Sequence, residues 1–295
     1  MTTTAIADVT NQIQKFWSPI FADKLRTGTL LPSLVSKEYE GSIANQGDTV
    51  YVSAIDTITA NRKTVGVGDY DSYSSNKLTM TRVSVAADTI IEAGVKIESL
   101  VALQSQVGAQ DSKIRAAMFY ALEVEVNNFL YSKVAASASA PDHVINGITD
   151  MNAAQLGATR VLASQAHWGA AERYFLCDPI YYQDLLNAAT LTGSDYGAAD
   201  APVVGGRFGM KRFGFNIFED DSAGIAQVSP TDLTTDLGLA FIPDWLLFVM
   251  QQGVTFKLSD LHATEKRGYL LTAELLCGAA LGIEGSKKHI QIYNT

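Results

Sequence analysis

The stretch ESLVALQSQVGAQDSKIRAAMFYALEVEVNNFLYSKVA, residues 98–135, carries the strongest helix pattern of the chain and decides the fold. Its apolar residues recur three or four positions apart, which is the spacing of one helix face. They are Leu100, Leu103, Val107, Ile114, Met118, Leu122, Val126, Phe129 and Leu130. Alanine, leucine, glutamate, glutamine and methionine dominate, and all are good helix formers. The pattern predicts one helix roughly 55 Å long at 1.5 Å per residue, about three times the mean length in globular proteins.

Upstream of this helix, two strand patterns enclose a long polar segment. The first is NQGDTVYVSAIDTIT, residues 45–59, and the second is KLTMTRVSVAAD, residues 77–88. In the second run the apolar residues change parity, which predicts a bulge near Thr81 and Arg82. The two runs predict a hairpin whose polar tip spans residues 60–76. A two-stranded hairpin alone in water is marginally stable at best, so we expect this one to depend on contacts outside itself.

The remaining segments flank the hairpin and the helix. Residues 1–46 have too few apolar residues for a domain and predict an extended arm with a short helix. Residues 145–250 alternate between helix and strand patterns, which is typical of a compact α/β or α+β domain. Residues 253–295 return to strand patterns with glycine and aspartate turns. We expect these last strands to pair with the long-helix region, which makes that domain discontinuous in sequence.

Bulk properties exclude several classes of function. The net charge of −9 argues against a surface that grips nucleic acid, because neutralising phosphates needs clustered lysine and arginine. The N-terminus lacks the pattern of a secretory signal. The most apolar run, residues 237–250, is too short to span a bilayer and is interrupted by Pro243 and Asp244. Two distant cysteines, Cys177 and Cys277, predict buried free thiols of a cytosolic protein.

A search for catalytic and ligand-binding motifs finds no convergent site. The four histidines have no metal-ligand spacing, and neither HExxH nor a GxSxG nucleophile motif is present. The glycines of GGRFG, residues 205–209, lack the spacing of a dinucleotide loop, and a loop before a strand is the simpler interpretation. The acidic run Glu219–Asp221 is read as a solvated turn, because calcium loops need more oxygens at set positions. We therefore predict no catalytic, cofactor-binding or metal-binding residues, and this favours a structural role.

The order of these segments resembles the major capsid proteins of tailed bacteriophages, which have the Hong Kong 97-like fold. The resemblance is closest over residues 16–60, which contain the runs LVSKEYEG and GDTV. Two further stretches are similar to family segments: RYFLCDPIYYQDLL, residues 173–186, and GGRFGMKRFGFNIFEDD, residues 205–221. No single motif is specific, whereas their ordered combination covers nearly the whole chain.

The resemblance implies an α+β fold in four parts. Residues 1–46 would be the N-terminal arm, and residues 47–92 would be the extended loop, a β-hairpin. Residues 93–144 and 251–295 would form the peripheral domain with the long helix as its spine. Residues 145–250 would be the axial domain, whose loops crowd around the symmetry axes of a shell.

The resemblance also implies a function without enzymatic activity, cofactor or membrane. The chain would be a major capsid protein that self-assembles, as hexamers and pentamers, into an icosahedral shell enclosing double-stranded DNA without sequence-specific binding. It would belong to the virion and be assembled in the cytoplasm of a host bacterium. A separate scaffolding protein, a portal and a decoration protein are the further partners to expect. The interface candidates are aromatic and basic residues of the arm, the hairpin and the axial loop: Trp17, Arg62, Lys63, Tyr70, Tyr73, Lys77 and Tyr196.

Three other functions are compatible with parts of the pattern. An encapsulin-type nanocompartment shell would use the same fold, but that family usually has a different N-terminal helix and less of an arm. An α/β enzyme could use Cys177 or Asp178, although no nearby residue in the sequence orients a base toward them. A secreted adhesive or surface-layer protein is disfavoured because a signal peptide is missing.

Overall fold

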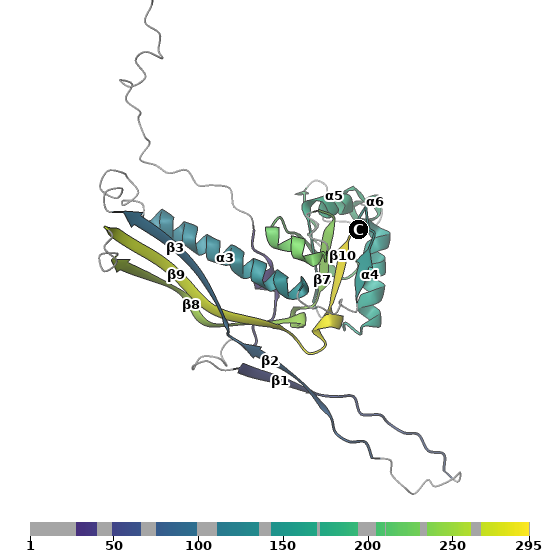
Figure 1. The fold of residues 1–295 in the computed structure, drawn as a ribbon. Helices are drawn as coiled ribbons and strands as arrows, with labels where there is room; N and C mark the ends of the chain where they lie inside the picture. Colours follow the sequence, from purple (N-terminus) through teal and green to yellow (C-terminus); the bar gives the residue numbers. More distant parts are fainter. Residues whose placement is uncertain are drawn as a thin grey trace, which may run out of the picture.

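A computed structural model provides the structure of the protein and shows two bodies joined by one long helix (Figure 1). One body is a long curved sheet, and the other is an α/β unit that holds the C-terminal strand. A narrow hairpin leaves the root of the curved sheet and projects away from both. The structure describes residues 28–39, 49–65, 75–98, 111–135, 143–169, 172–193, 205–209, 211–230, 235–260 and 267–294.

The curved sheet has three antiparallel strands in the order β3-β9-β8. They are β3 (Thr89–Glu98), β8 (Leu246–Asp260) and β9 (Gly268–Leu281). Alternate residues of β9 are buried, namely Leu271, Ala273, Leu275 and Cys277. Because successive side chains of a strand point to opposite faces, these four lie on one face. Helix α3 (Asp111–Ala135) lies along the sheet and supplies its cover (Figure 1).

Helix α3 confirms the apolar stripe but not the expected start of the helix. Its buried residues repeat at helical spacing: Met118, Leu122, Val126 and Leu130. The start at residue 98 is wrong, because Glu98 ends strand β3 and pairs with Gly268 of β9. Residues 99–110 lie outside the described part of the chain. The described helix has 25 residues, which corresponds to about 37 Å at 1.5 Å per residue.

The α/β unit contains a mixed five-stranded sheet in the order β4-β10-β7-β5-β6. Its strands are β4 (Val144–Asn146), β5 (Arg173–Cys177), β6 (Phe215–Glu219), β7 (Leu237–Phe241) and β10 (His289–Tyr293). The expectation that the last strand pairs with the long-helix region is wrong, because β10 lies between β4 and β7. All five residues of β10 are buried. Such a strand needs cover on both faces, and its residues pack into two buried clusters, Ile290 and Ile292 into one and Tyr293 into the other.

Local sequence signals explain the helices around this sheet. Helix α4 (Ala153–Gln165) starts at Asn152, whose side chain accepts from the backbone N–H groups of Ala154 and Gln155. Helix α5 (Pro179–Asn187) is capped in the same way by Asp178, with proline in its first turn, an arrangement that favours helix initiation. The predicted strand–proline–helix unit in RYFLCDPIYYQDLL is therefore confirmed. The other short helices are α1 (Leu31–Leu34), α6 (Ala189–Thr192), η5 (Ala223–Val228), η6 (Pro243–Trp245) and η8 (Gly285–Lys288). None of the described helices is long and apolar enough to cross a membrane.

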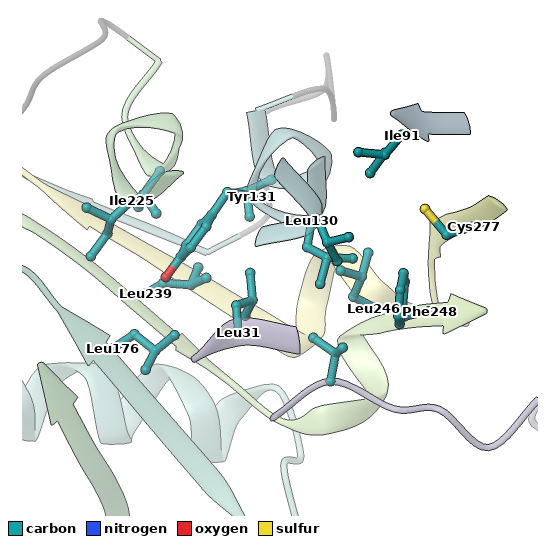
Figure 2. Packing of buried hydrophobic residues seen from close by; sticks show 14 of the residues in the cluster. Leu31, Ile91, Leu130, Tyr131, Leu176, Ile225, Leu239, Leu246, Phe248 and Cys277 are labelled. Carbon is teal, nitrogen blue, oxygen red and sulfur yellow. The ribbon is translucent and has the colours of Figure 1, made fainter. Parts of the chain in front are cut away.

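The largest buried cluster joins the two sheets through the C-terminal half of α3. Figure 2 shows Leu130 and Tyr131 of this helix between residues that come from both sheets. Leu239 belongs to β7 of the five-stranded sheet, whereas Phe248 belongs to β8 of the curved sheet. Leu31 of α1 fills the space between them and is fully buried. The helix therefore fixes the position of the curved sheet, from which the hairpin starts.

Candidate functional site

The projecting hairpin consists of β1 (Thr49–Ile55) and β2 (Met80–Ala86), which pair antiparallel. Thr49 pairs with Ala86 at the root, and Ile55 pairs with Met80 at the far end, without a shift of register. The bulge expected near Thr81 is therefore wrong. The parity change has another cause: the apolar residues of β2 lie on one face near the root and on the opposite face farther out.

The inner face of the hairpin is the side that packs against the curved sheet at the root. Val85 is fully buried there, in a cluster with Leu247 and Val249 of β8. Val50 and Val52 of β1 pack against the same cluster and are partly buried. The hairpin is therefore anchored by its root to the curved sheet.

A glycine of β9 allows the close approach that this anchor requires. A Cβ atom on Gly278 would lie 1.8 Å from the carbonyl oxygen of Ala86, at the end of β2. No side chain fits in that space, because the atom in the way belongs to the backbone. The position of the hairpin relative to the curved sheet thus depends on a residue without a side chain.

The outer face of the hairpin carries apolar side chains that the described residues leave uncovered. Ile55 is 62% exposed and Met80 is 60% exposed, and the two lie opposite each other. Tyr51 is also exposed, with the Arg82 guanidinium 4.4 Å from its ring centroid. The full set of large exposed apolar residues on the hairpin is Tyr51, Ile55, Ile58, Val65, Leu78 and Met80. Exposed apolar side chains gathered on one element indicate a surface that binds another molecule.

Hydrogen bonds keep the two chains together beyond the end of the ladder. The backbone N–H of Asp56 donates to the Thr79 carbonyl oxygen at 3.1 Å. The Thr81 hydroxyl donates to the Asp56 carboxylate at 2.6 Å, and the Asn76 side chain donates to the Thr59 carbonyl oxygen at 2.6 Å. The hydroxyls of Thr81 and Thr79 lower the pKa of Asp56. These contacts extend the hairpin as a paired element toward its tip.

The structure describes three of the seven interface candidates. Arg62, Lys63 and Lys77 are exposed, and all three belong to the hairpin beyond its ladder. The other four lie outside the described residues: Trp17, Tyr70, Tyr73 and Tyr196. The outer-face residues Tyr51, Ile55 and Met80 were missed. The signal for them was present, since apolar residues at both parities of one strand indicate two apolar faces.

The geometry gives no support to an enzyme that uses Cys177 or Asp178. Burial raises the pKa of the Cys177 thiol well above its ordinary value, so the thiol stays protonated and the reactive thiolate does not form. The carboxylate of Asp178 accepts from the backbone N–H groups of Tyr181 and Asp236, so both of its oxygens have structural partners. Within the described ranges, no group of three or more histidine, cysteine or acidic residues is arranged to hold a metal ion.

Comparisons with known proteins identify the fold. No protein-family profile matches the chain, and no curated protein matches it. A solved structure from Mycobacterium phage Che8 matches with a TM-score of 0.74 at 18% identity, over 95% of this chain and 96% of that chain. The capsid structure of cyanophage P-SCSP1u matches with a TM-score of 0.74 at 15% identity, over 100% of this chain and 95% of that chain.

A third solved structure also matches over nearly the whole chain at low sequence identity. The capsid asymmetric unit of cyanophage Pam1 matches with a TM-score of 0.73 at 10% identity, over 97% of each chain. The chain therefore has the fold of these phage structures from end to end. The predicted α+β, Hong Kong 97-like fold is confirmed.

Proposed function

We propose that this protein is the major capsid protein of a tailed bacteriophage. Copies of the chain assemble into an icosahedral shell that encloses double-stranded DNA, and the protein is thus a structural component of the virion. One observation carries the proposal: the hairpin is fixed at its root and presents an apolar outer face that the described parts of its own chain do not cover. A neighbouring copy covers this face in a shell, which also explains how a two-stranded hairpin is maintained.

The four-part division is part of this proposal. Residues 1–46 are the N-terminal arm, residues 47–92 the extended loop, residues 93–144 and 251–295 the peripheral domain, and residues 145–250 the axial domain. The strand pairing supports two changes to the proposed boundaries. Strand β3 starts at Thr89 in the curved sheet, and β10 belongs to the five-stranded sheet of the axial unit.

Assembly would proceed through repeated head-to-tail contacts between copies. Such a contact joins two different surfaces of one chain, and it closes into a ring when the rotation between copies allows it. Hexamers and pentamers of a shell are rings of this kind. A scaffolding protein, a portal and a decoration protein complete the set of proposed partners. The net charge of −9 supports a wall that encloses DNA without adhering to it.

Sedimentation velocity and electron microscopy of the purified protein test the proposal. We expect hexamers, pentamers or shells in the megadalton range. A monomer that stays monomeric at every accessible concentration would contradict it.

A deletion within the hairpin provides a second test. Replacing the segment between Asn61 and Asn76 by a short turn should impair assembly more than it impairs folding of the subunit, because the described fold anchors the hairpin only at its root. Far-UV circular dichroism and urea unfolding report on folding, and electron microscopy reports on shells. Normal shells from the deletion variant would show that the hairpin is dispensable.

A further inference from the structure

A cavity of about 460 Å³ lies where the C-terminal end of α4 meets η8, the short helical turn that connects β9 of the curved sheet to β10 of the five-stranded sheet. Its polar lining comes from three distant parts of the sequence: His143, Gln165, His167, Glu284, Lys287 and Lys288. Trp168 and Ile242, both buried, contribute apolar surface to the wall. A concave site of this volume has the size of pockets that hold a small molecule.

The polar groups of this cavity are mostly cations and hydrogen-bond donors. The Lys287 amine lies 3.4 Å from the Glu284 carboxylate, so this pair is close to neutral. Lys288 is half-buried, and among the described residues no carboxylate forms an ion pair with it. Each histidine carries at least one ring N–H in any protonation state, and the Gln165 amide carries two N–H groups. The cavity therefore has an uncompensated positive charge and several donors, which together suit an anion.

Contacts between backbone and side chains hold the two rims of the cavity together. The η8 rim packs so closely on η6 that a Cβ atom on Gly285 would lie 2.5 Å from the Trp245 carbonyl oxygen. The indole N–H of Trp168, which follows α4, donates to the Lys287 carbonyl oxygen at 2.7 Å. The cavity is therefore formed by the fold of the chain itself, and its donors are positioned before a ligand binds. Such preorganisation lowers the cost of binding.

Each rim also holds one residue in an uncommon backbone conformation. His167 has φ 59° and Glu284 has φ 55°, which places both residues in the left-handed region. Non-glycine residues persist in this conformation only where the surrounding structure imposes it, and such residues cluster at sites that bind ligands. The strain lies at the two lining segments that face each other across the cavity, so it points to a ligand site there.

The donor set favours phosphate over carboxylate. The planar fork of arginine matches a carboxylate, whereas lysine binds phosphate as a point charge. Among the described residues that line the cavity there is no arginine. The donors belong to separate side chains around the wall, and a phosphate group offers oxygens in several directions to accept from them. The apolar surface of Trp168 and Ile242 leaves room for the organic part of a ligand.

We propose that this cavity binds a small molecule that carries phosphate groups. Lys288 donates a charge-assisted hydrogen bond to a phosphate oxygen, and the Gln165 amide and the histidines donate to the others. The bound molecule ties the end of α4 to the connection between the two sheets, and binding to the folded chain alone stabilises it. All of these residues belong to one chain, so the inference goes beyond the proposed shell function and does not depend on it.

Isothermal titration calorimetry of the full chain with pyrophosphate tests the inference. We expect one binding site per chain. Lys288→Gln removes the uncompensated charge and should weaken binding by about tenfold, the loss of one charge-assisted hydrogen bond. Lys288→Arg keeps the charge and should bind more tightly than Lys288→Gln. Lys211→Gln is the matched control and should bind like the wild-type protein, because this exposed lysine of the same unit lies outside the cavity.

Urea unfolding provides a second readout. Pyrophosphate should raise the urea midpoint of the wild-type protein and of Lys211→Gln more than that of Lys288→Gln. Equal midpoints without pyrophosphate would show that the variants fold alike, so that a loss of binding belongs to the site. Absence of pyrophosphate binding, or equal affinities of the wild-type protein and Lys288→Gln, would overturn the inference.

Two further titrants test the chemical class of the ligand. Malonate, a small dicarboxylate, should bind more weakly than pyrophosphate, and equal affinities would overturn the assignment to phosphate. A short DNA duplex carries phosphates on a macromolecule and should not compete with pyrophosphate for the cavity. Displacement of pyrophosphate by the duplex would assign the site to the DNA backbone and overturn the assignment to a small molecule. None of these outcomes depends on whether the protein forms shells, so the proposed function is tested separately.

Discussion

Replacing Gly278 by alanine tests whether the hairpin is held by close contact with β9. The added Cβ would lie 1.8 Å from the carbonyl oxygen of Ala86 and 2.7 Å from its carbonyl carbon. Real Cβ contacts are essentially never shorter than 3.0 Å. The root of the hairpin and β9 must therefore separate by at least 1.2 Å, because no rotation of a side chain relieves a backbone contact.

The expected change in the free energy of unfolding of Gly278→Ala follows from two opposing effects. Overpacking a well-packed region typically costs about 1–3 kcal/mol, and here a backbone segment must move, so we take the upper part of that range. Alanine also restricts the unfolded chain, which stabilises the folded protein by about 0.4–1 kcal/mol at positions with ordinary backbone angles. We expect Gly278→Ala to lower the free energy of unfolding by about 2 kcal/mol. Displacement of the hairpin should also reduce assembly.

Urea unfolding monitored by circular dichroism measures this loss, and Gly94→Ala is the matched control. Gly94 lies in β3 of the same sheet, and its added Cβ would meet Thr272 at 3.8 Å, an ordinary van der Waals distance. The control should therefore match or slightly exceed the stability of the wild-type protein. Equal urea midpoints for Gly278→Ala and Gly94→Ala would refute the role of the close contact.

Three further substitutions or conditions test the core, the pH response and the hairpin. Tyr131→Phe removes the hydroxyl that donates to the buried Asp220 carboxylate at 2.5 Å, and urea titration should show a loss of about 1–3 kcal/mol. Burial lowers the pKa of His289 from 6.5 to about 4. The unfolded chain therefore binds a proton first, and stability falls as the pH drops from 6.5 toward 4, by as much as ~3 kcal/mol in urea titrations across that range. Ile55→Ser combined with Met80→Ser should raise the critical concentration for assembly, measured by sedimentation, and change subunit stability by less than about 0.5 kcal/mol.

Each of these predictions has a control or a result that contradicts it. Tyr174→Phe also removes a hydroxyl bonded to a carboxylate, but Glu172 is exposed, so we expect a change near zero. A loss as large as that of Tyr131→Phe would contradict the role of burial. His289→Gln should reduce the pH dependence of the free energy of unfolding between pH 6.5 and 4. An unchanged pH dependence would show that other groups cause it. Leu258→Ser removes an equally exposed apolar side chain outside the hairpin. If it raised the critical concentration as much as the Ile55→Ser, Met80→Ser variant does, the outer face of the hairpin would have no specific role in assembly.

The apolar stripe of the long helix could be predicted from sequence, but its first residue could not. Met118, Leu122 and Val126 repeat at helical spacing and are buried as expected. Upstream of these residues, Val95 and Ile97 are two positions apart, which is the period of a strand. Leu100 follows Ile97 by three positions, which fits a helix. The residues around position 98 therefore fit either structure. Pairing with β9 decides the outcome, and that strand lies about 170 residues later in the chain. Such a partner is invisible to any local pattern.

The candidate site divides in the same way between what the sequence predicts and what it leaves open. Arg62 and Lys63 follow from the polar composition between the two strand patterns, and Lys77 is the first residue of the second pattern. The cavity lined by His143, His167 and Lys288 does not follow in this way, because these residues are scattered in the sequence and meet only in the fold. The path of β10 could not be predicted, since the alternation of polar and apolar residues in HIQIY indicates a strand but not its neighbours in a sheet.

The parity change in the second hairpin strand is the most informative error. Periodicity predicts which side chains share a face, but it does not predict what covers that face. Near the root, the curved sheet covers the inner face, and Val85 is buried there. Farther out, the inner face leaves the sheet, and the apolar residues Ile55 and Met80 lie on the outer face instead. A change of apolar face along a regular ladder therefore marks where the hairpin stops packing on its own subunit, and we propose that contact with the next copy begins there.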